Sequence, residues 1–250
     1  MVIEVDTGDA PVRALFSTRE GGVSTGGHAS LNLGATSGDH PDAVRANRDA
    51  LARAAGFDPL RAVALAQVHG AEVFAAEAGG GAGTFTGSIE GVAECDAAVT
   101  RAPGVALLAM GADCPVIALW SDDGSVVAAV HAGWRGITRG VIAAGVGAMG
   151  VGADAVHASV GPHVGPCCYP VDAELRQAMA HAYGADVVVG DAVDLGLACR
   201  RALEHAGLAP EGIHVEDACT ACDEARFFSY RRDGAATGRQ AAVVWIEEGT

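Results

Sequence analysis

The sequence from Val105 to Gly136, VALLAMGADCPVIALWSDDGSVVAAVHAGWRG, decides the fold of this chain. It contains three short apolar runs, Val105–Met110, Val116–Trp120 and Val126–Val130, which are separated by Gly, Asp and Ser residues. Short apolar runs between turn-forming residues are typical of strands that are buried on both faces. We therefore expect three buried strands here, joined by turns.

Three reactive side chains lie where a predicted strand gives way to a turn. Cys114 follows the first apolar run, His131 ends the third, and His69 follows a further run at Ala62–Ala66. Zinc binds Cys sulfur and His nitrogen, and a catalytic zinc site usually has three protein ligands and one open position. The three side chains are therefore candidate metal ligands, although the residues alone do not exclude three separate core residues.

Length and composition favour a single domain over residues 1–250. Half of the residues are apolar, and the chain shows neither a tandem repeat nor a clear linker. The net charge of −15 argues against nucleic acids and anionic membranes as partners. No apolar run is long enough to cross a bilayer, and the first residues lack the pattern of a signal peptide, so we expect a cytoplasmic protein.

The chain contains no lysine, because all 16 basic residues are arginines. A Walker A phosphate loop and Schiff-base chemistry both need a lysine amine, so both are excluded. Any phosphate must therefore be held by arginine side chains or by backbone N–H groups.

Periodicity predicts an alternation of helices and strands, which is typical of the α/β class. We expect helices over residues 41–55, 137–149, 172–183 and 194–206. Besides the three central runs and 62–66, we expect strands over residues 12–17, 73–75, 96–100, 155–160, 213–215 and 240–246. The glycine-rich segment 79–91 is expected to be a loop beside the His69 strand, with a lid role.

The seven cysteines, an odd number without a signal peptide, are expected to be reduced. Cys219 and Cys222 follow His214-x-Glu216, which resembles the zinc signature of nucleobase deaminases, but the two halves are too close together. We expect a structural pair of thiols there rather than a second metal site. Adjacent cysteines rarely chelate one ion in good geometry. We therefore expect no metal site at Cys167 and Cys168 either. No role in turnover is expected for any cysteine except Cys114, that is, for Cys95, Cys167, Cys168, Cys199, Cys219 and Cys222.

Seven motifs in one order make the sequence similar to a known family. The sequence resembles the laccase-domain family, whose members were once called multicopper polyphenol oxidases and later purine nucleoside phosphorylases. The motifs are STREGGVS (17–24), SLNLG (30–34), Asn47-Arg48, QVHG (67–70), ADCP (112–115), HAGWRG (131–136) and FFSYRRDG (227–234).

The resemblance implies a layered α/β fold, a mixed-sheet sandwich flanked by helices, related to the cysteine-hydrolase domain of a bacterial toxin. It also implies that His69, Cys114 and His131 bind zinc and form the catalytic centre. An open zinc site can lower the pKa of a bound water or polarise a substrate oxygen. Members often carry Glu where this chain has Pro170, so Tyr169 before it is not expected to be catalytic.

The implied activity is phosphorolysis of adenosine, inosine, guanosine and methylthioadenosine, together with deamination of adenosine. The partners are then purine nucleosides and phosphate. Candidate substrate-binding residues come from the family motifs: Arg19, Asn32, Arg48, Gln67 and Arg231. Of these, the arginines are the candidates for phosphate.

Three alternatives use the same residues. Copper accepts imidazole and thiolate ligands, so a copper polyphenol oxidase (laccase) is possible, although nine histidines without a His-x-His pair suit several coppers poorly. A cysteine hydrolase would use Cys114 as nucleophile and His131 or His69 as base, cleaving amide bonds of cell-wall precursors. A non-catalytic binding module is the third alternative, and the open ligand position speaks against it.

Overall fold

We describe the chain from a computed structural model, which covers residues 1–77, 85–86 and 94–249. The segment 79–91, expected to be a lid, lies outside these residues except for Phe85 and Thr86.

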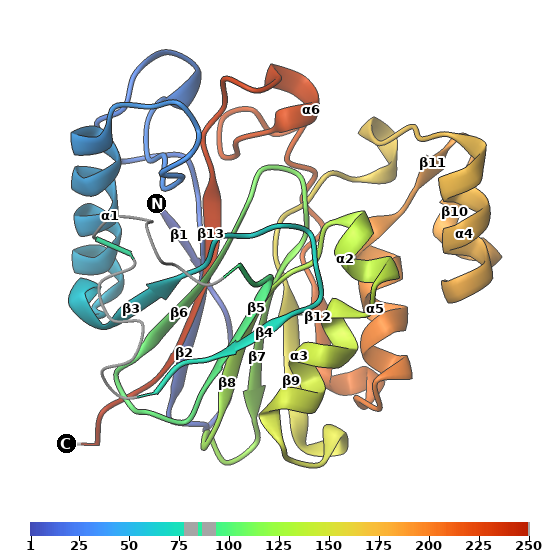
Figure 1. The fold of residues 1–250 in the computed structure, drawn as a ribbon, viewed down its shortest axis with the longest axis horizontal. Helices are drawn as coiled ribbons and strands as arrows, with labels where there is room; N and C mark the ends of the chain where they lie inside the picture. The colour runs from blue at the N-terminus through green and yellow to red at the C-terminus, as the bar shows by residue number, and fades with distance from the viewer. Residues whose placement is uncertain (78–84, 87–93, 250) are drawn as a thin grey trace.

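Two sheets form the centre of the structure (Figure 1). Both are mixed, because β3–β6, β4–β5 and β9–β12 pair in parallel and the other neighbours are antiparallel. The five-stranded sheet has the order β1 (Val2–Glu4), β2 (Val12–Ser17), β13 (Gln240–Ile246), β6 (Ala106–Gly111) and β3 (Ala62–Ala64). The six-stranded sheet has the order β12 (Ile213–Val215), β9 (Val156–Val160), β7 (Val116–Ser121), β8 (Val127–His131), β5 (Ala97–Thr100) and β4 (Val73–Ala75).

The two sheets pack face to face through the apolar side chains on their facing sides. Leu107 of β6 and Val244 of β13 join the core between the sheets, together with Val116 and Trp120 of β7. The intervening residues face the other way, since side chains alternate along a strand. This explains why the central runs are apolar at nearly every position.

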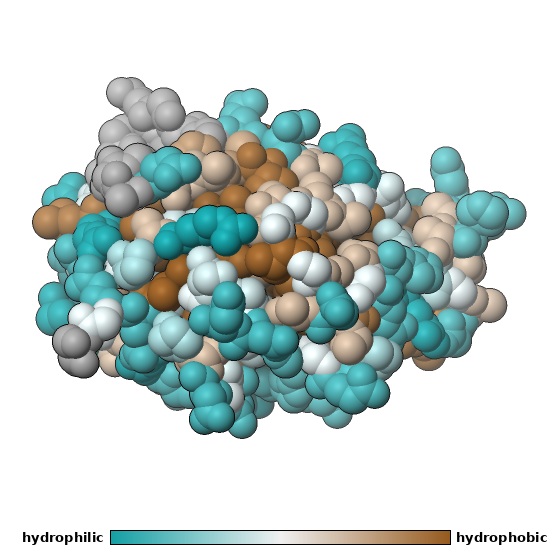
Figure 2. Space-filling model, turned by 90° about the horizontal axis from the view of Figure 1, so that it is seen from below, coloured by the Kyte–Doolittle hydropathy of each residue, from teal (hydrophilic) through white to brown (hydrophobic). Residues whose placement is uncertain are grey.

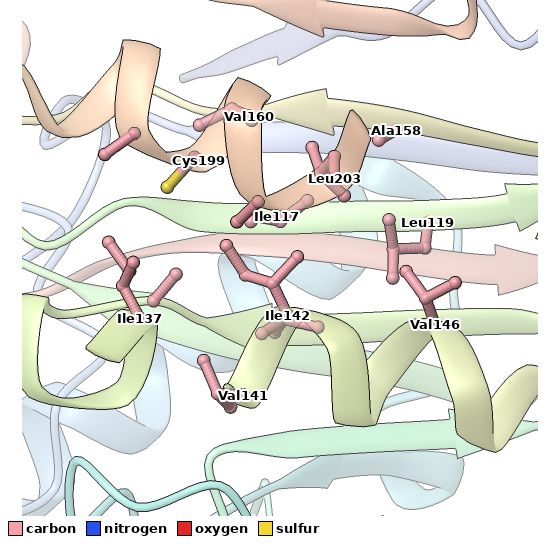
Figure 3. Close-up of a cluster of buried hydrophobic side chains, with 14 of the residues drawn as sticks. Ile117, Leu119, Ile137, Val141, Ile142, Val146, Ala158, Val160, Cys199 and Leu203 are labelled. Carbon is pink, nitrogen blue, oxygen red and sulfur yellow. The ribbon is translucent and has the colours of Figure 1, made fainter. Parts of the chain in front are cut away.

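Helices cover the outer faces of both sheets and complete four layers (Figure 1). On one flank, Leu51 of α1 packs with Leu108 and Val243 of the five-stranded sheet. On the other flank, α3 and α5 lie on the six-stranded sheet (Figure 3). The helices are α1 (Pro41–Ala55), α2 (Trp134–Thr138), α3 (Val141–Met149), α4 (Ala173–Tyr183), α5 (Leu195–His205) and α6 (Tyr230–Asp233).

Figure 3 shows how the second flank is packed. Ile142 and Val146 of α3 point toward Ile117 and Leu119 of β7, with Leu203 of α5 close by. Four of these side chains are almost fully buried and Val146 is buried, and burying an aliphatic side chain of this size contributes about 1.5–3 kcal/mol. The flank that carries α3 and α5 is therefore a full hydrophobic layer.

The predicted helices match the structure except in one place. The segment 137–149 is two helices, α2 and α3, because Gly140 adopts a left-handed conformation with φ of 85° between them. Helix α1 has its predicted bounds, with Pro41 in its first turn and Gly56 after its end. Asp172 and Asp194 accept hydrogen bonds from the first turns of α4 and α5, as expected for N-caps.

The predicted strands are all present within one or two residues of their expected bounds. The sequence did not predict β1, α6 or the short hairpin of β10 (Val188–Val189) and β11 (Ala192–Val193). The remaining elements are 3₁₀ turns: η1 (Gly26–His28), η2 (Pro59–Arg61), η3 (Ala153–Ala155), η4 (Pro166–Cys168), η5 (Ala185–Val187) and η6 (Pro210–Gly212).

The two ends of the sandwich differ in the residues and elements that they carry. Seen from below (Figure 2), hydrophilic residues cover most of the rim and hydrophobic residues gather near the middle. The opposite end carries α6 and the start of α2 (Figure 1), and there the candidate ligands lie. None of the described helices is both long and apolar enough to cross a bilayer.

Candidate metal centre and substrate pocket

The three predicted ligands come together at one point. The ligand atoms of His69, Cys114 and His131 all lie within 4.8 Å of one another. The two imidazole rings meet edge to face, with centroids 4.9 Å apart and an angle of 78° between their planes. The prediction that these residues form one cluster, rather than three separate core positions, is therefore correct.

Asp96 organises two of the three ligands. Its fully buried carboxylate accepts hydrogen bonds from the backbone N–H groups of Val68 (3.1 Å), His69 (2.9 Å) and Gly70 (2.7 Å). These bonds stabilise the positive φ of 58° at His69, a conformation that non-glycine residues rarely adopt. The same carboxylate lies 2.8 Å from Nδ1 of His131.

Asp96 also fixes which atom of His131 is available. Because Nδ1 is hydrogen-bonded to the carboxylate, Nε2 is left to act as a ligand, the arrangement typical of metal-binding histidines. Burial alone would raise the pKa of Asp96, but the hydrogen bonds from His131 and from the backbone of Gly70 and Val68 lower it to about 2. The group is therefore a carboxylate at neutral pH.

The thiol of Cys114 is tuned toward its anionic form. Burial alone would raise its pKa, but hydrogen bonds from His131 and His69 lower it to about 6. The pKa of His131 moves in the opposite direction, to about 9, because Asp96 and Cys114 outweigh the effect of burial. A thiolate and two imidazoles form a donor set that suits zinc.

Two residues next to the ligands, Gly133 and Asp113, fix the local packing and the backbone of the cluster. A Cβ atom on Gly133 would lie 3.0 Å from Sγ of Cys114 and 2.9 Å from Cδ2 of His69, so only glycine fits there. Asp113 has a φ of 89°, and its carboxylate accepts hydrogen bonds from Oγ1 of Thr220 (2.6 Å) and from the backbone N–H of Arg231 (2.5 Å). Asp113 thereby joins the Cys114 turn to α6.

The cluster opens into a pocket of about 870 Å³. Aromatic side chains of Trp134, Tyr169 and Tyr230 line it beside the ligands. Among the described residues that line it, Asp113 is the one acidic residue, whereas four are arginines: Arg48, Arg135, Arg231 and Arg239. A chain with a net charge of −15 thus has a pocket with a local excess of positive charge.

The four arginines differ in how they are held. The Nε and Nη2 atoms of Arg48 donate to the carbonyl of Leu33 at 2.8 and 2.6 Å, and Nη1 donates to that of Phe85. Burial lowers the pKa of Arg48 to about 10, so it is still a cation at neutral pH. Arg239 donates to the carbonyls of Thr237 and Gly238.

The other two arginines rest on aromatic rings. Arg231 lies over the ring of Tyr169 at 4.9 Å, and Arg135 lies over that of Trp134 at 4.3 Å. Among the described residues, neither guanidinium has a hydrogen-bond or ion-pair partner. These two cations are available to an anionic ligand.

The structure brings three of the five predicted substrate-binding residues to the pocket, namely Arg48, Gln67 and Arg231. The amide of Gln67 pairs with the backbone of Met110, donating to its carbonyl at 2.6 Å and accepting from its N–H at 2.8 Å. This pair continues the parallel contact between β3 and β6 beyond its last backbone partner. Gln67 therefore also shapes the wall of the pocket.

The other two predicted residues lie elsewhere. Asn32 is fully buried, and its amide bonds Ser37, Asp39 and the backbone N–H groups of Gly34 and Arg239. Arg19 donates to the carbonyls of Ala29 and Glu224 and is not among the residues that line the pocket. Both side chains hold loops together at the positions where the structure places them.

Sequence reasoning missed several residues of the site, among them Asp96, Arg135, Tyr169 and Arg239. Asp96 was counted as the first residue of a strand, yet an acidic residue directly before the apolar run of residues 97–99 was a usable signal. Tyr169 was not expected to be catalytic, because Pro170 follows it where family members often carry Glu. The structure nevertheless places Tyr169 in the lining of the pocket. Arg239, directly before the last strand, carried no signal that distinguishes it from an ordinary surface arginine.

The fold and the site together define an α/β protein with two packed mixed sheets and a His–Cys–His cluster at one end of them. The family model described as "multi-copper polyphenol oxidoreductase laccase" matches residues 13–247, and the chain belongs to this family. The resemblance seen in the seven motifs is confirmed.

Individual relatives cover almost the whole chain. A Shigella flexneri protein named purine nucleoside phosphorylase YfiH is 39% identical over 241 residues, covering 94% of each chain. A Streptomyces coelicolor protein named purine nucleoside phosphorylase is also 39% identical over 241 residues, covering 93% of this chain and 94% of the relative. The crystal structure of YlmD from Geobacillus stearothermophilus has a TM-score of 0.89 and 31% identity, covering 96% of this chain and 93% of that one.

Proposed function

We propose that the protein is a zinc-dependent purine nucleoside phosphorylase that acts on adenosine, inosine, guanosine and methylthioadenosine. The names of its relatives support an enzyme of this kind. The observation that carries the proposal is the shared pocket, in which the His–Cys–His cluster lies beside four arginines. Phosphorolysis needs a site for a multiply charged anion next to a site for an aromatic nucleoside, and the arginines and the aromatic side chains of this pocket are suited to these two substrates.

Arg135 and Arg231 are the proposed phosphate ligands. Arginine offers a planar fork of donors that fits phosphate oxygens, and these two guanidinium groups have no competing partner among the described residues. Arg48 and Arg239 are held by carbonyl groups and contribute positive charge to the pocket instead. The focused field favours entry of an anion despite the negative net charge of the chain.

The chemistry itself is a displacement at the anomeric carbon of the ribose. A phosphate oxygen forms a bond to C1′ while the bond from C1′ to the purine nitrogen breaks, and the purine leaves with the electron pair and gains a proton. The protein binds the phosphate, stacks the purine against aromatic side chains such as Tyr169 and Tyr230, and excludes water that would compete with phosphate.

His69, Cys114 and His131 would hold the metal, because their donor set and the Asp96 hydrogen bond to His131 fit zinc. When bound, zinc supplies a Lewis acid that can polarise a substrate oxygen or lower the pKa of a water. We include deamination of adenosine to inosine in the proposal on the same basis.

The test is a nucleoside assay of the purified protein with and without phosphate. We expect release of hypoxanthine from inosine only when phosphate is present, with ribose 1-phosphate as the second product. Removal of the metal by a chelator should abolish the reaction, and added zinc should restore it. Free ribose formed at the same rate without phosphate would contradict the proposal.

A second candidate function rests on one specific observation. Cys114, His131 and Asp96 form a thiol–imidazole–carboxylate series, and the lowered pKa of Cys114 is what a nucleophilic cysteine needs. A cysteine hydrolase that cleaves amide bonds of cell-wall precursors would use this series without metal. Chelation should then leave activity unchanged, and alkylation of Cys114 should abolish it.

The copper alternative is supported by the name of the family model. Elemental analysis distinguishes copper from zinc directly. Oxidation of phenols by a copper-loaded sample, with no phosphate-dependent release of purine, would favour this alternative.

A further inference from the structure

A second cluster of metal-type ligands lies outside the pocket. The sulfur atoms of Cys167, Cys168, Cys219 and Cys222 all lie within 4.8 Å of one another. From sequence, the two cysteine pairs were expected to be unrelated structural thiols. The structure instead brings them to one point from two segments that are about 50 residues apart.

The spacing of the sulfur atoms suits a single ion. Sγ of Cys222 lies 3.4 Å from Sγ of Cys168 and 3.6 Å from Sγ of Cys167. Four sulfurs at the usual Zn–S distance of about 2.3 Å form a tetrahedron whose edge is about 3.8 Å. The distances are much longer than a disulfide bond of about 2.05 Å, and each of the seven cysteines is a free thiol.

The backbone around the cluster is already arranged for bound thiolates. The N–H of Gly165 donates to Sγ of Cys219 at 3.2 Å. N–H groups that point at a ligand sulfur are outer-shell contacts that tune a metal site.

Fixed loops carry the four ligands. Cys167 and Cys168 lie on η4, after β9, and Cys219 and Cys222 lie in the loop after β12. His163 joins the two loops, since its N–H donates to the carbonyl of Ala218 and its carbonyl accepts from the N–H of Thr220. Arg232, which also forms an ion pair with Asp233, donates to the carbonyls of Thr220 and Ala221 and thereby holds the loop that carries Cys219 and Cys222.

We propose that Cys167, Cys168, Cys219 and Cys222 form a second, structural zinc site. All four positions of the ion are filled by protein, so the site is closed, as structural zinc sites are. The ion ties the loop that leads into Tyr169 to the loop whose Thr220 holds Asp113. It therefore stabilises the wall of the pocket without taking part in the reaction.

The first test is metal stoichiometry of the full-length protein purified under reducing conditions. We expect two zinc ions per chain in the wild type and one in both Cys114→Ala and the double variant Cys167→Ser/Cys222→Ser. Cys95→Ser is the matched control, because it removes a thiol that belongs to neither cluster, and it should retain two. One equivalent in the wild type that survives in the double variant would overturn the proposal.

The second test does not depend on whether the double variant folds. The one zinc expected in Cys114→Ala should show, by X-ray absorption spectroscopy, a shell of sulfur alone at about 2.3 Å. Nitrogen or oxygen in that shell, absence of zinc, or a disulfide among the four cysteines in the reduced protein would each overturn the proposal. Because both tests read metal rather than turnover, failure of the phosphorylase assay leaves them unaffected.

Discussion

The carboxylate of Asp96 lies 2.8 Å from Nδ1 of His131 and also accepts the backbone N–H of His69 at 2.9 Å. One side chain thus orients both histidines of the cluster, the first through its ring and the second through its backbone. Since neither histidine has another carboxylate partner among the described residues, the geometry of the site depends on this contact.

Asp96→Asn should weaken zinc binding at the His–Cys–His site by about 10–100-fold, because an amide orients the histidine less strongly than a carboxylate does. Competition with a chromogenic chelator measures the affinity. The control is Asp122→Asn, since Asp122 lies 2.5 Å from Nε2 of His157 on the surface. Equal affinities in the two variants would show that Asp96 does not act through His131.

Gly133→Ala should cost the site its metal while the fold remains. The added methyl group would lie 3.0 Å from Sγ of Cys114 and 2.9 Å from Cδ2 of His69, which is closer than non-bonded atoms normally approach, so one of the two side chains must move. Zinc content and circular dichroism together give the result. Gly147→Ala on α3 is the matched control, because a Cβ atom there meets nothing within 4 Å, and that variant should keep its zinc.

Arg231→Ala should raise the KM for phosphate by roughly 10–100-fold, since a hydrogen bond to a charged group contributes about 1.5–3 kcal/mol. Zinc content should not change, because the guanidinium lies over Tyr169 rather than on a ligand. Steady-state kinetics with phosphate varied at saturating inosine measure the effect. Arg53→Ala removes a cation outside the pocket and should leave the KM unchanged. An unchanged KM in Arg231→Ala would remove this residue from the phosphate site.

Arg48→Ala should lower the melting temperature more than it changes substrate binding. It removes the donors of two buried carbonyl groups, and unsatisfied buried groups cost about 1–3 kcal/mol each. For a chain of this size, each kcal/mol lowers the melting temperature by about 2–4 °C. The control is Arg45→Ala on the exposed side of the same helix, for which we expect almost no change.

Metal removal should expose Cys114 to alkylation. In the metal-free protein its pKa of about 6 makes the thiol mostly anionic at pH 7, so its rate of alkylation should be half-maximal near pH 6, level off at higher pH and fall at lower pH. Mass spectrometry of the labelled peptide distinguishes Cys114 from the other cysteines. In the zinc-loaded protein, alkylation at Cys114 as fast as in the stripped protein would contradict its role as a ligand.

Elements with strong local patterns were predictable from sequence. The apolar runs gave the strands, and Pro41, Gly56, Asp172 and Asp194 marked helix ends by local chemistry. The split between α2 and α3 was missed because Gly140 acts through its backbone conformation rather than through a side-chain pattern. The strands β1, β10 and β11 are too short to show a period.

The candidate metal ligands could be predicted because each one ends or closely follows a run of apolar residues that marks a buried strand. The cysteine cluster could not, since it depends on how two distant loops meet, and adjacent cysteines are poor chelators when considered alone. Asp96 was missed for a related reason: its partners lie 26 to 35 residues away along the chain. Long-range contacts of loops carry little local signal.

The alternation of side chains along β8 restricts how relatives of this chain can vary in length. Val127 and Ala129 face the space between the sheets, and His131, two residues on, continues that face at the mouth of the sandwich. A single insertion or deletion inside β8 would turn His131 to the opposite face and abolish the cluster. Length changes at residues 122–125, in the turn between β7 and β8, would leave the strand register untouched. Indels should therefore accumulate at this distal turn and be absent from the strand that delivers the ligand.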